Sequence, residues 1–332
     1  MTTLSPVQSL SKLNLGWQPH FVQRLLKTNR WIVWNLVFYC IAFIATLVLA
    51  VVDTRLVTGA PVWIKPLKFA ISSILYLGTL LWILSYVEGR RRLVNIVLVA
   101  TAIGFGVELV AIWLQAGRGV RSHFNVSTAF DATLFSMMGA FVLVIWAMNI
   151  LAALLLLWQR MPDRTLAWAL RLGLLITIVG GSIGALMTQP TPDQLATMQA
   201  GHAPTFVGAH SIGVEDGGPG LPFTGWSTEG GDLRVGHFFG LHALQILPLL
   251  GILINRRWGR RLAERRRVAL IWIGGLGYLG LTGLLTWQAL RGQPLIAPDA
   301  LTLTTMAGLI AAVLVSSWLT IRLPQPGIGQ ES

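Results

Sequence analysis

The chain has 332 residues, 54% of them hydrophobic and 11% charged, and its mean hydropathy is +0.66. A water-soluble fold has no core large enough for that much apolar surface, so these values exclude a soluble domain and predict an integral membrane protein. The single cysteine, Cys40, excludes an intramolecular disulfide, and the +12 net charge lies in short clusters beside apolar segments, which argues against nucleic-acid binding.

The first 30 residues lack the short apolar core and the small-residue cleavage site of a secretory signal, so the first apolar segment is expected to remain as a helix. Residues 17–26 combine apolar side chains with Arg24, and Lys27 follows them, a mixture that predicts a helix lying in the membrane interface. We therefore expect residues 1–30 to form a cytoplasmic and interfacial segment.

Crossing a hydrocarbon core of about 30 Å takes roughly 20 apolar residues in a helix. Eight segments satisfy this length, near residues 31–52, 67–87, 93–115, 129–158, 166–187, 235–254, 268–289 and 300–321. We therefore predict an all-α fold, a polytopic transmembrane helical bundle in a lipid bilayer. Its single transmembrane domain covers residues 31–322, and a short cytoplasmic tail follows at 323–332.

The orientation is predicted from the distribution of Lys and Arg, because basic residues resist translocation. One set of helix ends carries 18 of the 25 basic residues, including the seven arginines between 256 and 267. We expect this set to face the cytoplasm, together with both termini. In a bacterial cell, the membrane would be the cytoplasmic membrane.

The polar residues that most need an explanation lie at the other set of helix ends, which predicts a multi-residue site at the extracytoplasmic face. The candidate catalytic residues are Glu108, Asp131 and His123. The candidate anion-binding or substrate-binding residues are Lys65, Lys68, Gln115, Arg118, Asn125 and Arg234. Arg binds carboxylate or phosphate bidentately and Lys supplies a point charge, although such side chains also reach outward to lipid headgroups.

Glu108 is the most informative of these residues, because an ionisable group about two turns inside a helix end costs a few kcal/mol unless it is paired, neutralised or hydrated. The alternative to a functional role is a structural ion pair with Arg118 or with a lysine of the second span. Asp131 begins the fourth span, where an aspartate also stabilises a helix dipole.

The histidines suggest a divalent metal such as zinc, with ligands drawn from His123, His237, His242 and Asp232. His237 and His242 are five residues apart, about 140° around a regular helix, so they bind one metal together only if the helix is distorted. A second cofactor hypothesis is a b-type haem between His123 and one of these two histidines. The alternative is a set of hydrogen-bonded interfacial histidines.

A gathering of histidines and an aspartate near one membrane face resembles the intramembrane zinc hydrolases of the ceramidase and adiponectin-receptor type. In those enzymes the paired C-terminal histidines are four residues apart, whereas His237 and His242 are five apart and belong to the sixth of eight spans. The resemblance concerns architecture, which does not establish function.

The one long polar segment, about 188–234, joins the fifth and sixth spans on the extracytoplasmic side. Its glycines allow tight turns, and its acids, such as Glu215 and Glu229, are ligands for hard cations. The interspersed Leu221, Phe223 and Trp226 favour a compact lid over a flexible linker.

Two classes of function fit these features. The first is a metal-assisted hydrolase or transferase of the outer leaflet, acting on a lipid-like or amphipathic substrate. The second is a transporter or receptor that binds a small solute or a proton with the same residues. The helix centres are nearly free of charge, which favours a site at the membrane edge.

Overall fold

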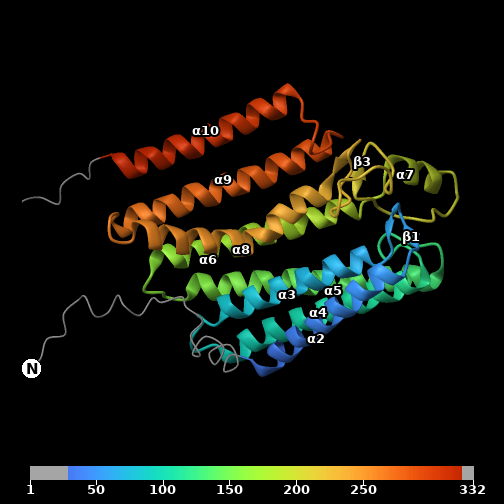
Figure 1. Cartoon of the computed structure of the whole chain (residues 1–332), viewed down its shortest axis with the longest axis horizontal. Helices are drawn as coiled ribbons and strands as arrows, with labels where there is room; N and C mark the ends of the chain where they lie inside the picture. The colour runs from blue at the N-terminus through green and yellow to red at the C-terminus, as the bar shows by residue number, and fades with distance from the viewer. Residues whose placement is uncertain (1–28, 324–332) are drawn as a thin grey trace, which may run out of the picture.

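The computed structural model describes residues 29–323 (Figure 1). Its long helices are α2 (Arg30–Val52), α3 (Ile64–Leu84), α4 (Arg91–Arg118), α5 (Ala129–Trp158), α6 (Arg164–Met187), α8 (Leu233–Trp258), α9 (Glu264–Leu290) and α10 (Ala300–Arg322). The connecting segments contain the short helix α7 (Pro192–Gln199) and the two-residue strands β1 (Leu56–Val57), β2 (Ala60–Pro61), β3 (Ser211–Ile212) and β4 (Gly231–Asp232). The predicted interfacial helix at 17–26 and the tail from residue 324 lie outside the described residues.

Eight helices in this part of the chain are long and apolar enough to cross a membrane, which confirms the predicted all-α polytopic bundle. Several of them extend beyond the apolar segments expected from the sequence. The helix α3 starts at Ile64 because Pro66 is tolerated in a first turn, where backbone N–H groups have no helical partner. The helix α4 continues to Arg118 and ends at Gly119, which adopts the left-handed conformation with φ of 70°.

The helices form two groups that lie side by side (Figure 1). One group contains α2, α3, α4 and α5, and the other contains α6, α8, α9 and α10. Trp146 of α5 joins the two groups, because its indole N–H donates to the carbonyl of Ile178 in α6. Gln245 of α8 also donates to the hydroxyl of Thr79 in α3, at 3.4 Å.

The helices α6 and α8 make the closest contact of the second group. A Cβ atom added to Gly180 of α6 would lie 2.4 Å from the backbone carbonyl carbon of Gly240 in α8. In a bilayer the hydrophobic effect does not drive helices together, because lipid tails are as apolar as the side chains. Small residues let the helices approach closely, so that van der Waals contact stabilises their association. Gly180 and Gly240 therefore let α6 and α8 approach closely.

The loops that carry the two small hairpins gather at one end of the bundle, which we call the lid end (Figure 1). The segment 188–232, which we call the lid, is folded: α7 starts with a capping box formed by Thr191 and Gln194, and β3 pairs with β4 in antiparallel register. An isolated bridge between Asn125 and Phe206 attaches the lid to the α4–α5 connection. This confirms the expectation of a compact lid.

Candidate functional site

The connection between α4 and α5 places a histidine over the end of α4. After Gly119 ends the helix, the chain turns through residues 120–128, and Phe124 has a positive φ of 63°. The Phe124 ring packs against His210 of the lid, with 4.9 Å between ring centroids. This turn directs the neighbouring His123 toward α3 and α4 rather than away from the bundle.

His123 lies between a lysine and a buried carboxylate. Its Nδ1 atom is 3.1 Å from the Nζ atom of Lys65 and 3.1 Å from the Oγ atom of Ser122. Its Nε2 atom is 3.9 Å from the Oε2 atom of Glu108. We call Glu108, His123 and Lys65 the acid–base group.

The charges of the acid–base group follow from the donors that are present. A lysine ammonium has only donors, so Nδ1 of His123 accepts from Lys65 and the imidazole proton lies on Nε2, facing Glu108. Burial and then the positive charge of Lys65 lower the pKa of His123 well below its ordinary value, so that the imidazole is neutral at pH 7.

Glu108 and His123 differ in how far they are exposed to solvent. The Glu108 side chain is 2% exposed, whereas 27% of the His123 side chain is exposed. The Oε1 atom of Glu108 is buried and has no hydrogen-bond partner. A molecule at the lid end can therefore contact His123 directly, whereas the Glu108 carboxylate is buried beneath the surface.

Asp131 belongs to a separate polar cluster at the start of α5. Its carboxylate accepts from Arg118 at 2.5 Å, from Gln115 at 2.8 Å and from Thr128 at 2.6 Å. The Arg118 guanidinium also contacts Gln115 and lies over the Phe130 ring. Arg118 therefore pairs with Asp131, so the alternative of a structural ion pair between Arg118 and Glu108 is not found within the described residues.

Asn125, a predicted ligand-binding residue, stabilises the turn before α5. Its Oδ1 atom accepts from the backbone N–H of Ser127 at 3.1 Å and from the hydroxyl of the same residue at 2.7 Å. Asn125 is buried, with 3% exposure. Its polar atoms are thus used within the α4–α5 connection.

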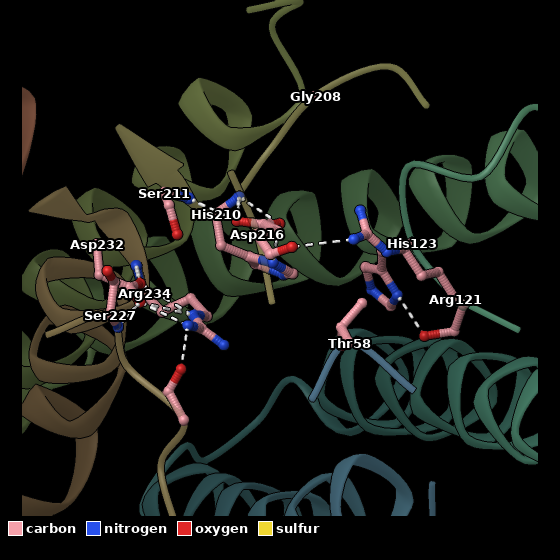
Figure 2. Close-up of polar contacts among 12 residues, drawn as sticks. Thr58, Arg121, His123, Gly208, His210, Ser211, Asp216, Ser227, Asp232 and Arg234 are labelled. Carbon is pink, nitrogen blue, oxygen red and sulfur yellow. Dashed lines mark hydrogen bonds and ion pairs between the residues drawn. The ribbon is translucent and has the colours of Figure 1, made fainter. Parts of the chain in front are cut away.

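The lid contributes a second histidine–carboxylate pair, which lies between His123 and Arg234 in Figure 2. The Nδ1 atom of His210 is 2.7 Å from Oδ2 of Asp216, and the backbone N–H groups of His210 and Ser211 donate to the same carboxylate. Burial by itself would raise the pKa of Asp216, but these hydrogen bonds hold it below its ordinary value. Asp216 therefore stays ionised and holds the turn closed.

Arg121 attaches this turn to the α4–α5 connection. Its guanidinium donates to the backbone carbonyl of Asp216 at 3.0 Å (Figure 2). The same guanidinium lies over the Phe206 ring. Neither His210 nor Asp216 is among the site residues predicted from the sequence. The acidic, glycine-rich composition of the lid indicated tight turns there, but it did not indicate which side chains meet.

Three predicted anion-binding residues do gather at the lid end. Lys65 interacts electrostatically with both Lys68 and Arg234. The Arg234 guanidinium is held by Asp232 through Nε at 2.9 Å and Nη2 at 2.5 Å (Figure 2). Asp232 is buried and also accepts from the backbone N–H of Ser227, so it belongs to this ion pair.

The metal hypothesis is not supported. Within residues 29–323, no group of three or more His, Cys, Asp or Glu side chains is placed so that it could hold a metal ion. The four predicted metal ligands do not lie together and have separate partners. Asp232 pairs with Arg234, His237 contacts the Gly180 carbonyl at 2.7 Å, and His242 contacts Gln245 at 3.2 Å. The fourth, His123, belongs to the acid–base group. The haem hypothesis stays a prediction, because the contacts of His237 and His242 use Nδ1 and leave Nε2 of each ring without a contact of this kind among the described residues.

The apolar helices and their arrangement define an α-helical multi-pass membrane protein. No protein-family model matches the chain, and no curated protein and no solved structure matches it either. The function is therefore inferred from the geometry at the lid end.

Proposed function

We propose that the chain is a membrane enzyme, a hydrolase or transferase that acts at the extracytoplasmic face on an amphipathic substrate with an anionic group. The observation that supports this most strongly is the acid–base group, in which a reachable imidazole lies between Lys65 and the buried, partly unpartnered carboxylate of Glu108. His123 serves as the general acid and base, and Glu108 orients the imidazole and stabilises its protonated form. Lys65 supplies positive charge beside the reacting group.

The proposed orientation places the lid end outside the cell and both termini in the cytoplasm. It is supported by the excess of Lys and Arg at the opposite end of the bundle. A substrate embedded in the outer leaflet would present its headgroup at the depth of Lys65, one residue after the start of α3.

The test is turnover of lipids by purified protein in liposomes made from the polar lipids of the source membrane, followed by lipid mass spectrometry. Wild type should convert at least one lipid class, and His123→Ala should lower the rate by about 100-fold or more, because general acid–base catalysis typically contributes that much. His202→Ala, at an exposed position of the lid, should leave the rate unchanged. Wild-type protein that converts nothing, or His123→Ala with an unchanged rate, would count against the enzyme.

A second candidate function is transport of a small solute or a proton. It is favoured by the polar contact between Gln245 and Thr79. Gln245 follows the first residue of α8, Leu233, by 12 residues, which places it about 18 Å along the helix from the lid end. Polar side chains at that depth are expensive in lipid. Flux into proteoliposomes, abolished in a Gln245→Leu, Thr79→Val double variant while lipid composition stays constant, would favour transport over turnover.

A further inference from the structure

The lid contains a tight turn, residues 220–227, which we call the lid tip. It is closed by an isolated bridge between Gly220 and Ser227 and by the hydrogen bond from the N–H of Leu221 to the carbonyl of Trp226, at 2.8 Å. The carbonyl groups of Thr224 and Gly225 lie at its apex.

Two cationic side chains from different helices bind these consecutive carbonyls. Lys68 of α3 donates to the carbonyl of Thr224 at 3.0 Å, and Arg234 of α8 donates to the carbonyl of Gly225 at 2.6 Å. Both helices start at the lid end (Figure 1), and these two hydrogen bonds make the lid tip a bridge between the two helix groups. A carbonyl accepts a hydrogen bond from a cation but carries no net charge, whereas a phosphate would accept the bond and also neutralise the cation.

The positive charge around these two side chains is only partly neutralised. Asp232 neutralises Arg234, but Lys68 donates only to the Thr224 carbonyl among the hydrogen bonds of residues 29–323. Lys65, one turn away on the same helix, adds positive charge. The Glu108 carboxylate is 2% exposed, so an anion that binds at the surface would meet the lysines rather than this acid.

The conformation of the lid tip is suited to release. Phe223 has a positive φ of 64°, which is strained for a bulky residue, and 67% of its surface is exposed. The attachment of the tip to α8 also includes a ring contact between Trp226 and Phe238, with 5.5 Å between centroids. A ligand that replaces the two carbonyls would relieve the strain at Phe223.

We propose that Lys68 and Arg234 form a binding site for a phosphate or phosphate-ester group, and that the lid tip occupies this site until such a group displaces it. This inference rests on the proposed function, because it supplies the anionic group of the substrate and places it beside the acid–base group. The two helices would then hold the anion at the lid end in place of the tip.

The test uses a nitroxide spin label on Phe223→Cys in a Cys40→Ser background, with the protein in a maltoside detergent. The Phe223 side chain is exposed, so the label does not disturb the contacts of the tip. Inorganic phosphate and, separately, dihexanoyl phosphatidic acid below its micelle concentration are titrated while the label mobility is followed by electron paramagnetic resonance. A saturable shift from an immobile to a mobile label is the expected result.

Variants distinguish displacement of the tip from a nonspecific effect of charge. Lys68→Gln should show a mobile label without ligand and bind the phosphate group about tenfold more weakly, the effect of losing one charge-assisted hydrogen bond. Lys68→Arg should restore both properties. The control is Arg55→Gln, which also removes one positive charge at the lid end but from a residue that pairs with Asp53. It should behave as wild type.

Each outcome is decisive. Binding of both probes with similar affinity supports a site for free phosphate, and binding of the lipid alone supports a site for a headgroup. A label that stays immobile while a probe binds overturns the displacement, and absence of binding by both probes overturns the site. Because the readout requires no turnover, Glu108→Gln should still bind the probe; binding without lipid conversion would leave this site standing while the proposed enzyme fails.

Discussion

Glu108 illustrates how a single residue can be costly to the fold and useful to the site. Its carboxylate is buried in α4, its Oε1 atom has no partner, and its nearest charged or chargeable contact is His123 at 3.9 Å. Such a group destabilises a protein unless it is neutralised or paired. A buried ionisable residue of this kind in a membrane helix therefore points to a functional role.

The first prediction concerns this cost. Glu108→Leu should leave the thermal stability of the purified protein unchanged or raise it, because the buried polar group is removed. The same variant should lose lipid conversion in liposomes. A clear drop in the unfolding temperature would instead indicate that Glu108 is a structural partner of His123 and Lys65.

Asp131 should behave in the opposite way. Asp131→Asn should destabilise the protein by about 1–3 kcal/mol, because Arg118 and Gln115 lose an ionised acceptor. A double-mutant cycle with Arg118→Gln, measured by denaturant unfolding, should give a coupling energy that accounts for much of this loss. If the two substitutions were additive, the ion pair would contribute nothing to stability.

Asp216 predicts a dependence of the lid on pH. Its pKa is held below the ordinary value by the hydrogen bonds described above, so its contribution to stability is complete above the unfolded pKa of about 3.9 and is lost as pH falls through the folded value. Asp216→Asn should therefore lower the unfolding temperature at pH 6 but make a smaller difference at pH 3. An equal difference at both values would contradict this role.

At the scale of helices, the contact between α6 and α8 depends on glycines. A methyl group at Gly180 would meet the backbone of Gly240 at 2.4 Å, and backbone cannot move aside as a flexible side chain can. Gly180→Ala should therefore destabilise the bundle by about 1–3 kcal/mol in denaturant unfolding. Gly139→Ala in α5 is the matched control, since no atom lies within 4 Å of its added Cβ, and it should cause no loss of stability.

At the scale of the whole molecule, the orientation is tested by labelling with a membrane-impermeant maleimide in a Cys40→Ser background. Glu229→Cys in the lid should react in intact cells, and Arg261→Cys between α8 and α9 should react only after the membrane is opened. Both positions are exposed, so access to the protein surface does not limit the reaction. The reverse pattern would place the lid in the cytoplasm and overturn the outer-leaflet substrate.

The predicted site residues divide into two kinds once their partners are known. Lys65, Lys68, His123, Glu108 and Arg234 were expected at one polar site, and the structure gathers them at the lid end. Asn125 and Asp131 were also expected there, but their polar atoms bind neighbours in the α4–α5 connection. A sequence shows that a buried polar group needs a partner, but it does not show which of several partners it has.

Membrane insertion depends on the composition of each helix, so the spans were predictable from local patterns in the chain. The folded lid was predictable from its turn-forming residues and its interspersed apolar side chains. The pairing of side chains depends on which segments meet. Lys65 and His123 are separated by 58 residues, and Lys68 and Thr224 by 156. No local pattern records such contacts; they arise because the helix groups pack against each other and bring the lid tip over the ends of α3 and α8.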